Sequence, residues 1–284
     1  MPPRKDNKTS KPNTPLNVLF LGDVVGRPGR QAITKHLPDL REKLKIDFVI
    51  CNGENAAGGF GITPKTATEL FNAGVDVITL GDHTWDKPET PDQLKKDWRM
   101  LRPHNFPKGT PGKGFHVYPI GDGRQIAVVN LMGRVFMNQN ALDCPFQAAM
   151  ALQETLQLGR NCDALIVDMH AEATSEKCCM GGLWDGKASL VTGSHTHIPT
   201  ADAHIMPKGT GYQTDAGMCG VYKGSSLGAD LESGIQRFTT AGRVPLKPAK
   251  GEGTLCGTFA KIGADGFCED VRPIRVGGDL IEAK

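Results

Sequence analysis

The chain carries an apolar run that ends in two histidines, Ser189-Leu-Val-Thr-Gly-Ser-His-Thr-His-Ile-Pro199. A short apolar run bounded by glycine is typical of a buried strand. In extended backbone, His195 and His197 stand two residues apart and therefore project to the same side. Two imidazoles at a strand end can bind one metal ion, or one each of two adjacent ions, if carboxylates elsewhere complete the ligands. The alternative is an ordinary surface loop, because a short motif alone is a weak signal.

Three earlier apolar runs also end in polar side chains. They are residues 17–22 before Asp23, 47–51 before Asn52, Glu54 and Asn55, and 75–80 before Asp82 and His83. Helical patterns lie between them at 31–44 and 64–73, and Thr63-Pro64 predicts an N-cap followed by proline at the first helical position. Because strands and helices alternate, we expect a parallel sheet with its ligands at the carboxyl ends of the strands.

The second half of the chain adds more strands. Two runs separated by Gly121-Asp-Gly123 predict a hairpin of antiparallel strands that extends the sheet. A run that ends at His170 predicts a buried strand, and stretches on either side of it predict helices. The expected elements are strands at 115–118, 125–130, 164–170, 203–206, 254–262 and 267–274 and helices at 145–158 and 172–184, while 222–251 is loop-rich and unassigned.

Composition sets limits on the class of protein. The chain has 284 residues, a net charge of +2 and 23% charged residues, which gives no electrostatic surface for extensive nucleic-acid or membrane binding. No apolar run is long enough to cross a bilayer. We expect one domain over residues 16–284 and a disordered basic tail over 1–15, with a nucleic-acid or targeting arm as the alternative for the tail. Eight cysteines without a Cys-x-x-Cys pair predict reduced, mostly buried thiols in a cytoplasmic protein.

The polar residues at the strand ends form a set that suits metal ions. Five independent strand ends carry carboxylates, amides or imidazoles in roughly equal number, which suits a pair of divalent first-row ions bridged by one carboxylate. The set is Asp23, Glu54, Asn55, Asp82, His83, His170, His195 and His197.

The motifs that contain these residues resemble those of the calcineurin-like metallophosphoesterases, and in particular the YmdB family of bacterial cyclic-nucleotide phosphodiesterases. The resemblance extends from about residue 17 to 274. It implies a four-layer α/β sandwich with mixed sheets flanked by helices, a dinuclear metal centre and hydrolysis of phosphodiesters, with 2′,3′-cyclic nucleotides as the characteristic substrate. The motifs are Asp23 after Leu-Gly, Gly53-Glu-Asn55, Gly81-Asp-His-Thr-Trp-Asp86, Asp168-Met-His170 and Gly193-Ser-His-Thr-His197.

The resemblance also implies a role for each residue. The first ion would be bound by Asp23 and His197 with Asn55 close by, Glu54 would bridge, and the second ion would be bound by Asp82, His170 and His195. His83 would be catalytic and not a ligand. Iron or manganese is the expected metal, with zinc, cobalt and nickel left open.

Two positions depart from the family pattern. Val25 stands where the wider superfamily has the histidine of Asp-x-His, and Asn55 is a candidate for its place. Asp82 stands where the family motif Gly-Asn-His has asparagine. A carboxylate still binds metal, but its extra negative charge should hold cations more tightly, weaken them as Lewis acids and repel a phosphate anion.

The expected reaction follows from these parts. A hydroxide shared by two ions attacks phosphorus, and His83 donates a proton to the leaving ribose oxygen as general acid. Asp86 either orients His83 or caps a helix. The expected partner is a small phosphodiester, with no membrane; a homo-oligomer is left open. The alternatives are a phosphatase or phosphodiesterase that acts on another small phosphoester, and a regulatory RNA- or protein-binding module that retains a metal site.

Overall fold

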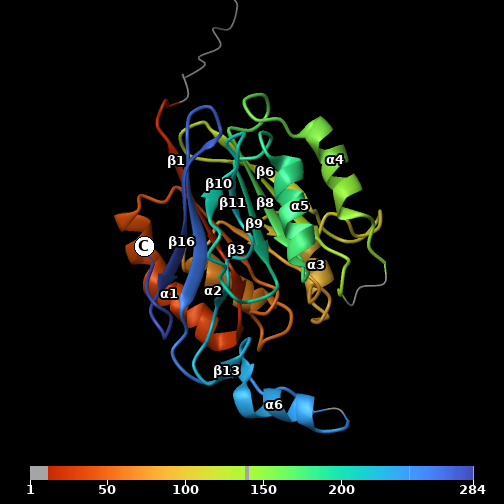
Figure 1. Ribbon diagram of the computed structural model, residues 1–284. Helices are drawn as coiled ribbons and strands as arrows, with labels where there is room; N and C mark the ends of the chain where they lie inside the picture. Colours follow the sequence, from red (N-terminus) through yellow and green to blue (C-terminus); the bar gives the residue numbers. More distant parts are fainter. Residues whose placement is uncertain (1–11, 138–140, 243, 284) are drawn as a thin grey trace, which may run out of the picture.

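The computed structural model describes residues 12–137, 141–242 and 244–283 (Figure 1). The tail expected over 1–15 therefore lies largely outside the described residues. Within its last part, the Thr14 carbonyl oxygen accepts a hydrogen bond of 2.7 Å from Arg124, and the first strand begins at Leu16.

The first sheet contains the predicted parallel strands. Its order is β16-β15-β1-β3-β4-β5. Strands β1, β3, β4 and β5 run parallel, with Leu19 opposite Val49 and Cys51 opposite Ile78, and β15 and β16 add to the other edge antiparallel. The bounds are β1 Leu16–Leu21, β3 Phe48–Asn52, β4 Val77–Thr79, β5 Met100–Leu101, β15 Leu255–Ile262 and β16 Cys268–Val276.

The second sheet has the order β10-β11-β9-β8-β7-β6. The predicted hairpin is present as β6 and β7, but the expectation that it extends the first sheet was wrong. Strand β7 pairs in parallel with β8, Ile126 opposite Ala164, so the hairpin forms an edge of the second sheet. Periodicity predicts a strand, and it carries no information about which sheet the strand joins. The bounds are β6 Phe115–Pro119, β7 Gln125–Met132, β8 Ala164–His170, β9 Leu190–Ser194, β10 His204–Ile205 and β11 Gly211–Gln213.

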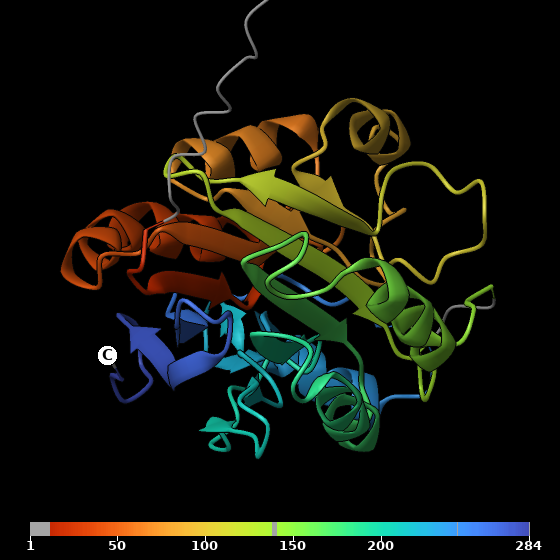
Figure 2. The ribbon, with the colours of Figure 1, turned by 90° about the horizontal axis from the view of Figure 1, so that it is seen from above.

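The two sheets pack face to face between two layers of helices. Alternate side chains of β1 divide between the two faces of its sheet: Val18 and Phe20 pack in the core between the sheets, and Leu19 and Leu21 pack in the core under the helices. Figure 2 shows α1 and α2, in red and orange, on the opposite side of the sheets from α4 and α5, in green. This is the predicted four-layer α/β sandwich, and it buries both faces of each sheet.

The four helices that the sequence predicts are present, one of them with an earlier start, while α3 and α6 were not predicted. Thr63 is the N-cap of α2 in a capping box with Thr66, as the sequence predicts. Helix α1 begins at Gly26 and not at Gln31. Pro28 allows this earlier start because it lies in the first turn, where a backbone N–H has no partner within the helix and its absence costs nothing. The bounds are α1 Gly26–Lys43, α2 Pro64–Asn72, α3 Thr90–Lys96, α4 Pro145–Thr155, α5 Thr174–Trp184 and α6 Leu231–Thr239.

Residues 222–251, called here the cap segment, contain more regular structure in their described part, 222–242 and 244–251, than the sequence indicates. They hold a short hairpin of β13 (Ser225–Ser226) and β14 (Ala229–Asp230), followed by α6. Figure 1 shows that α6 stands out from the sheets and their helices.

Two further expectations concern the chain as a whole. No described helix is both long and apolar enough to span a membrane. All eight cysteines are free, and five of them are buried, as the sequence predicts.

Candidate metal centre

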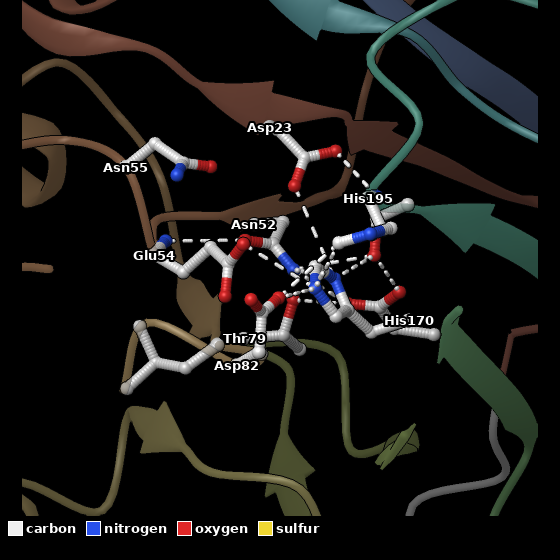
Figure 3. A network of polar contacts seen from close by, with 12 residues as sticks. Asp23, Asn52, Glu54, Asn55, Thr79, Asp82, His170 and His195 are labelled. Atoms are coloured by element: carbon white, nitrogen blue, oxygen red, sulfur yellow. Dashed lines mark hydrogen bonds and ion pairs between the residues drawn. The ribbon is translucent and has the colours of Figure 1, made fainter. Parts of the chain in front are cut away.

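Strand ends of both sheets bring the predicted residues together. Asp23 lies in β2 (Asp23–Val24), directly after β1, and is held by parallel pairing with β12 (Met218–Cys219). Glu54 and Asn55 follow β3, and Asp82 follows β4. From the second sheet come His170 at the end of β8, and His195 and His197 after β9. Figure 3 shows the labelled side chains of this set converging.

The tightest group is Glu54, Asp82, His170 and His195. Each of these residues offers a ligand atom, and the four atoms lie within 4.8 Å of one another. His170 Nε2 is 3.0 Å from Asp82 Oδ1 and 3.3 Å from Glu54 Oε1, and His195 Nδ1 is 3.2 Å from Asp82 Oδ1. The first three are buried or nearly so, with side-chain exposures of 1%, 16% and 0% in that order. This group matches the residues expected at the second ion together with the expected bridge.

Asp23 and His197 lie beside this group. Asp23 Oδ1 is 3.8 Å from His197 Nε2, while Asp23 Oδ2 accepts a hydrogen bond of 2.9 Å from the His195 backbone. Within the described part of the chain, the buried Oδ1 atoms of Asp23 and Asn55 accept no hydrogen bond. A buried acceptor without a donor costs free energy, and a cation bound beside either oxygen would remove that cost.

A buried network beneath His170 sets the orientation of its ring. Ser194 Oγ donates to Asp168 Oδ1 at 2.7 Å, and His170 Nδ1 lies 2.9 Å from the same Oγ. Asn52 Nδ2 lies 3.3 Å from Asp168 Oδ2, 3.2 Å from Ser194 Oγ and 3.2 Å from His170 Nδ1, and we assign its two protons to the two oxygens. Because the single Ser194 proton goes to Asp168, Ser194 accepts from His170, and we assign the proton of the ring to Nδ1. The Nε2 atom of His170 then faces Glu54 and Asp82.

The other two imidazoles are held in the same way. His195 Nε2 lies 3.1 Å from Glu172 Oε2, and His197 Nδ1 lies 2.9 Å from the Leu227 carbonyl oxygen. Carboxylate and carbonyl oxygens only accept, so each outer nitrogen carries a proton, and in the neutral ring each inner nitrogen would offer its lone pair to a metal ion. Metal-binding histidines are oriented by such outer partners. The inner nitrogens of His170 and His195 lie 3.0–3.3 Å from carboxylate oxygens, where a metal ion can take the place of a proton between nitrogen and oxygen, and the residues therefore fit metal ions.

Ionisation of the buried groups reflects this excess of negative charge. Burial disfavours a charged imidazole, yet Glu54, Asp82 and Asp23 together raise the pKa of His170 well above its ordinary value. Burial likewise works against a charged Asp82, but hydrogen bonds with His170 and His195 hold the pKa of Asp82 well below its usual range. Deep burial raises the pKa of Asp168 to about 6, although His170 opposes this shift.

The backbone that carries His195 and His197 differs from the prediction. Strand β9 ends at Ser194, and the two histidines have φ of 93° and 64°, in the left-handed region and not in extended backbone. They reach the site from a turn, so their alternate spacing does not explain why both face it. Left-handed backbone at residues other than glycine is strained and persists only where the surroundings hold it.

A buried ion pair holds this turn. Asp215 Oδ2 accepts hydrogen bonds from the Thr196 backbone at 3.2 Å and from the Thr196 hydroxyl at 2.7 Å. The same oxygen lies 2.6 Å from Lys177 Nζ, and both side chains are fully buried. Lys177 in α5 and Asp215 therefore fix the residue between the two histidines.

His83 borders the group and has a different environment. Its backbone nitrogen donates to Glu54 Oε2 at 2.9 Å, its Nδ1 lies 2.7 Å from Asp86 Oδ2, and its Nε2 is 3.7 Å from Asp82 Oδ2. Burial lowers the pKa of His83, but Glu54, Asp82 and Asp86 outweigh it and raise the pKa. The N-cap of the following helix α3 is Glu89, so Asp86 contacts His83 and is not the cap of α3.

Gly81 makes the close approach of these groups possible. A Cβ atom at this position would lie 2.2 Å from His170 Nε2 and 2.4 Å from Glu54 Oε2. Any larger residue would therefore occupy the space between ligands that come from different sheets.

Sequence reasoning missed the residues that orient the ligands. Glu172 lies two positions after His170, and Lys177 lies in the following helix, but no local pattern connects them to His195 or Thr196. Ser194, which lies within the motif of His195 and His197, is placed by the structure beneath His170. The one sequence signal for residues that orient the ligands is Asp168 in the motif Asp168-Met-His170.

An α/β sandwich whose two sheets jointly place carboxylates and imidazoles at one end has the architecture of the metallophosphoesterases. A family model described as YmdB-like protein matches residues 19–274. The chain therefore belongs to the YmdB-like family, as its motifs predict.

Individual relatives agree with this assignment. The chain is 47% identical over 247 residues to the 2′,3′-cyclic-nucleotide 2′-phosphodiesterase of Bacillus subtilis strain 168, covering 87% of this chain and 91% of the relative. A solved structure of a novel phosphatase from Mycoplasma pneumoniae is 34% identical with a TM-score of 0.87, covering 93% of this chain and 94% of that chain. A hypothetical protein from Thermus thermophilus is 42% identical with a TM-score of 0.84, covering 92% of this chain and 99% of that chain. The predicted enzyme class, a phosphoric diester hydrolase, is confirmed.

Proposed function

We propose that the protein hydrolyses 2′,3′-cyclic nucleotides with the help of two divalent metal ions. The observation that carries the metal site is the arrangement of three imidazoles, each with its outer nitrogen held by an acceptor and its inner nitrogen directed at carboxylates. The substrate class is supported by the Bacillus subtilis relative, a 2′,3′-cyclic-nucleotide 2′-phosphodiesterase, which this chain matches over most of its length.

The donor set divides between two ions. Asp23, Asn55 and His197 would hold one ion, and Asp82, His170 and His195 would hold the other. Glu54 has one oxygen near His170 and the other bonded to the His83 backbone, and it would bridge. Mixed carboxylate and imidazole ligands favour iron or manganese, with zinc, cobalt and nickel also compatible. When bound, such ions supply Lewis-acid stabilisation of the phosphoryl group and an activated hydroxide.

His83 is the candidate general acid. Its Nδ1 is held by Asp86 at 2.7 Å, which turns Nε2 toward the side of Asp82 and leaves that nitrogen available for a proton transfer. The bond that breaks joins phosphorus to a ribose oxygen, and the leaving alkoxide takes a proton from His83 Nε2. Asp86 keeps the ring in the tautomer and orientation that this transfer requires.

A substrate panel tests the proposal. Purified protein is stripped of metal, reloaded with manganese or iron, and assayed against 2′,3′-cAMP, 3′,5′-cAMP and bis-p-nitrophenyl phosphate. We expect turnover that is lost on stripping, restored on reloading and fastest with 2′,3′-cAMP. Preference for a different phosphoester would replace the substrate but keep the reaction class. If the reloaded protein turned over none of the compounds, the proposal would fail in favour of a regulatory binding module that retains the metal site.

A further inference from the structure

A cavity of about 500 Å³ opens directly over the metal centre. Glu54, Asn55, His83, His195 and His197 form its floor. Its other walls come from the loop around Phe60 and from the cap segment, residues 222–251, which contributes Leu227, Arg237, Phe238, Leu246, Lys247 and Pro248. A substrate whose phosphorus lies at the metal centre must therefore place the rest of the molecule against these walls.

The cap segment is attached to the metal centre at one point. Leu227 and Gly228 form the two-residue turn between β13 and β14, with φ of 54° and 92°, as a type I′ turn requires. The Leu227 carbonyl oxygen accepts from His197 Nδ1 at 2.9 Å. Gly228 packs so closely on Val25 that a Cβ would lie 2.5 Å from its Cγ1 atom. The turn is therefore fixed, and it sets where α6 begins.

Two aromatic rings line the cavity without being covered by the protein. Phe60 is 44% exposed and packs edge-on against the His83 ring, with 5.0 Å between the ring centroids. Phe238, near the end of α6, is 88% exposed. Exposed aromatic rings that line a cavity beside a reactive centre indicate contact with a ligand, because apolar surface gains free energy when it leaves water.

We infer that this cavity binds the nucleobase of the substrate, with Phe60 and Phe238 in contact with the base; the inference rests on the proposed function. A nucleobase has apolar planar faces, which suit the two rings, and a polar edge, which suits donors such as the Arg237 guanidinium. The alternative occupant of the cavity is a second phosphate group of the substrate. It could pair with Arg237 and Lys247, but it would lie against a mainly apolar wall of Leu227, Phe238, Leu246 and Pro248. The cap segment therefore determines which phosphodiesters enter.

The first test compares a diester that has a base with one that lacks it. The two substrates are 2′,3′-cAMP and glycerol 1,2-cyclic phosphate, which carries the same five-membered ring. For Phe60→Ala and Phe238→Ala we expect kcat/KM for 2′,3′-cAMP to fall about tenfold or more, mainly through KM, with little change for the base-free diester. Phe238→Trp should retain the activity of the wild type. Ile235→Ala is the matched control, since Ile235 is 55% exposed on the same helix and lies outside the cavity lining.

The second test measures contact with the base without turnover. Saturation-transfer NMR with 3′-AMP should show transfer to the H2 and H8 protons of adenine in the wild-type protein and its loss in Phe238→Ala. Absence of transfer in the wild type would overturn the inference. If neither diester is hydrolysed, the proposed function fails, and this measurement still decides whether the cavity binds a base.

Other outcomes separate the competing explanations. Equal losses with both diesters would overturn the inference, because the rings would then act on the metal centre or on folding. Unchanged kinetics with both diesters would also overturn it and place the base elsewhere. If Arg237→Ala slows both substrates equally while the phenylalanine variants slow neither, the cavity binds an anion and not a base.

Discussion

At the scale of single residues, the site depends on which atom of each ring faces inward. The chemical types of the ligands are visible in the sequence because carboxylates and histidines follow apolar runs. The orientation of the rings is not visible there, since it depends on partners such as Glu172 and Leu227 that are distant in sequence from the histidines they hold. The sequence therefore predicts the set of ligands, and the structure adds the orientation of their side chains.

Glu172 offers a direct check on ring orientation. Its carboxylate is half exposed and contacts only the outer nitrogen of His195 among the predicted ligands. We expect Glu172→Ala to weaken binding of the second ion about tenfold, the lower end of the range for outer partners of metal-binding histidines. Glu172→Gln should weaken it less, because the amide oxygen still accepts from His195 Nε2. Calorimetric titration of metal-stripped protein with manganese measures both; equal affinities in all three proteins would contradict the orientation argument.

Asp82 is the residue at which the sequence analysis expects a departure from the family motif. Its Oδ1 contacts both His170 and His195, so the carboxylate occupies the place of a ligand. We expect Asp82→Asn to keep an oxygen ligand, to bind manganese roughly tenfold more weakly and to raise kcat, because one negative charge near the phosphate is removed. Tighter binding, or slower turnover at saturating metal, would show that the charge assists the site.

At the scale of elements, most helices and strands follow from periodicity, and the exceptions have physical causes. The pattern of Thr63-Pro64 predicts the start of α2 because capping is local chemistry. No local sequence pattern predicts the left-handed turn at His195 and His197, because that turn is held by α5 and Asp215 from other parts of the chain. The cap segment cannot be assigned from sequence for a similar reason: it buries few apolar residues and so has little periodicity.

The Lys177–Asp215 pair should be costly to break. Removing one partner leaves a charge buried without compensation, so we expect Lys177→Met to lower the free energy of unfolding by about 3–5 kcal/mol. Lys35→Met is the matched control, because the Lys35–Glu252 pair is exposed on both sides and should show no measurable change. Chemical denaturation measures both variants. A variant Lys177→Met as stable as the wild type would show that the turn is held by other contacts.

At the scale of the whole molecule, the proposed centre connects two sheets. Asp23, Glu54, Asn55 and Asp82 follow strands of the first sheet or lie beside it, while His170, His195 and His197 come from the second. The two-sheet architecture is predictable from the order of motifs through the family resemblance. The pairing of strands within each sheet is not, as the position of β6 and β7 shows.

Metal binding should therefore stabilise the fold. An ion that binds only the folded state raises its stability by an amount set by concentration and affinity, about 2.7 kcal/mol at a hundredfold excess over Kd. We expect manganese to raise Tm and a chelator to lower it in a concentration-dependent manner. His197→Ala should reduce the shift, whereas His204→Ala should not, since His204 lies on an exposed edge strand outside the site. A Tm that does not change with metal would contradict a metal centre whose ligands come from both sheets.

The number and positions of the ions decide the central claim most directly. Anomalous diffraction at the manganese edge, from crystals grown with manganese, would locate them. The account predicts two peaks, one between Asp23, Asn55 and His197 and one between Asp82, His170 and His195, with Glu54 between the two. A single peak, or peaks away from these residues, would contradict a dinuclear centre and with it the proposed hydrolysis.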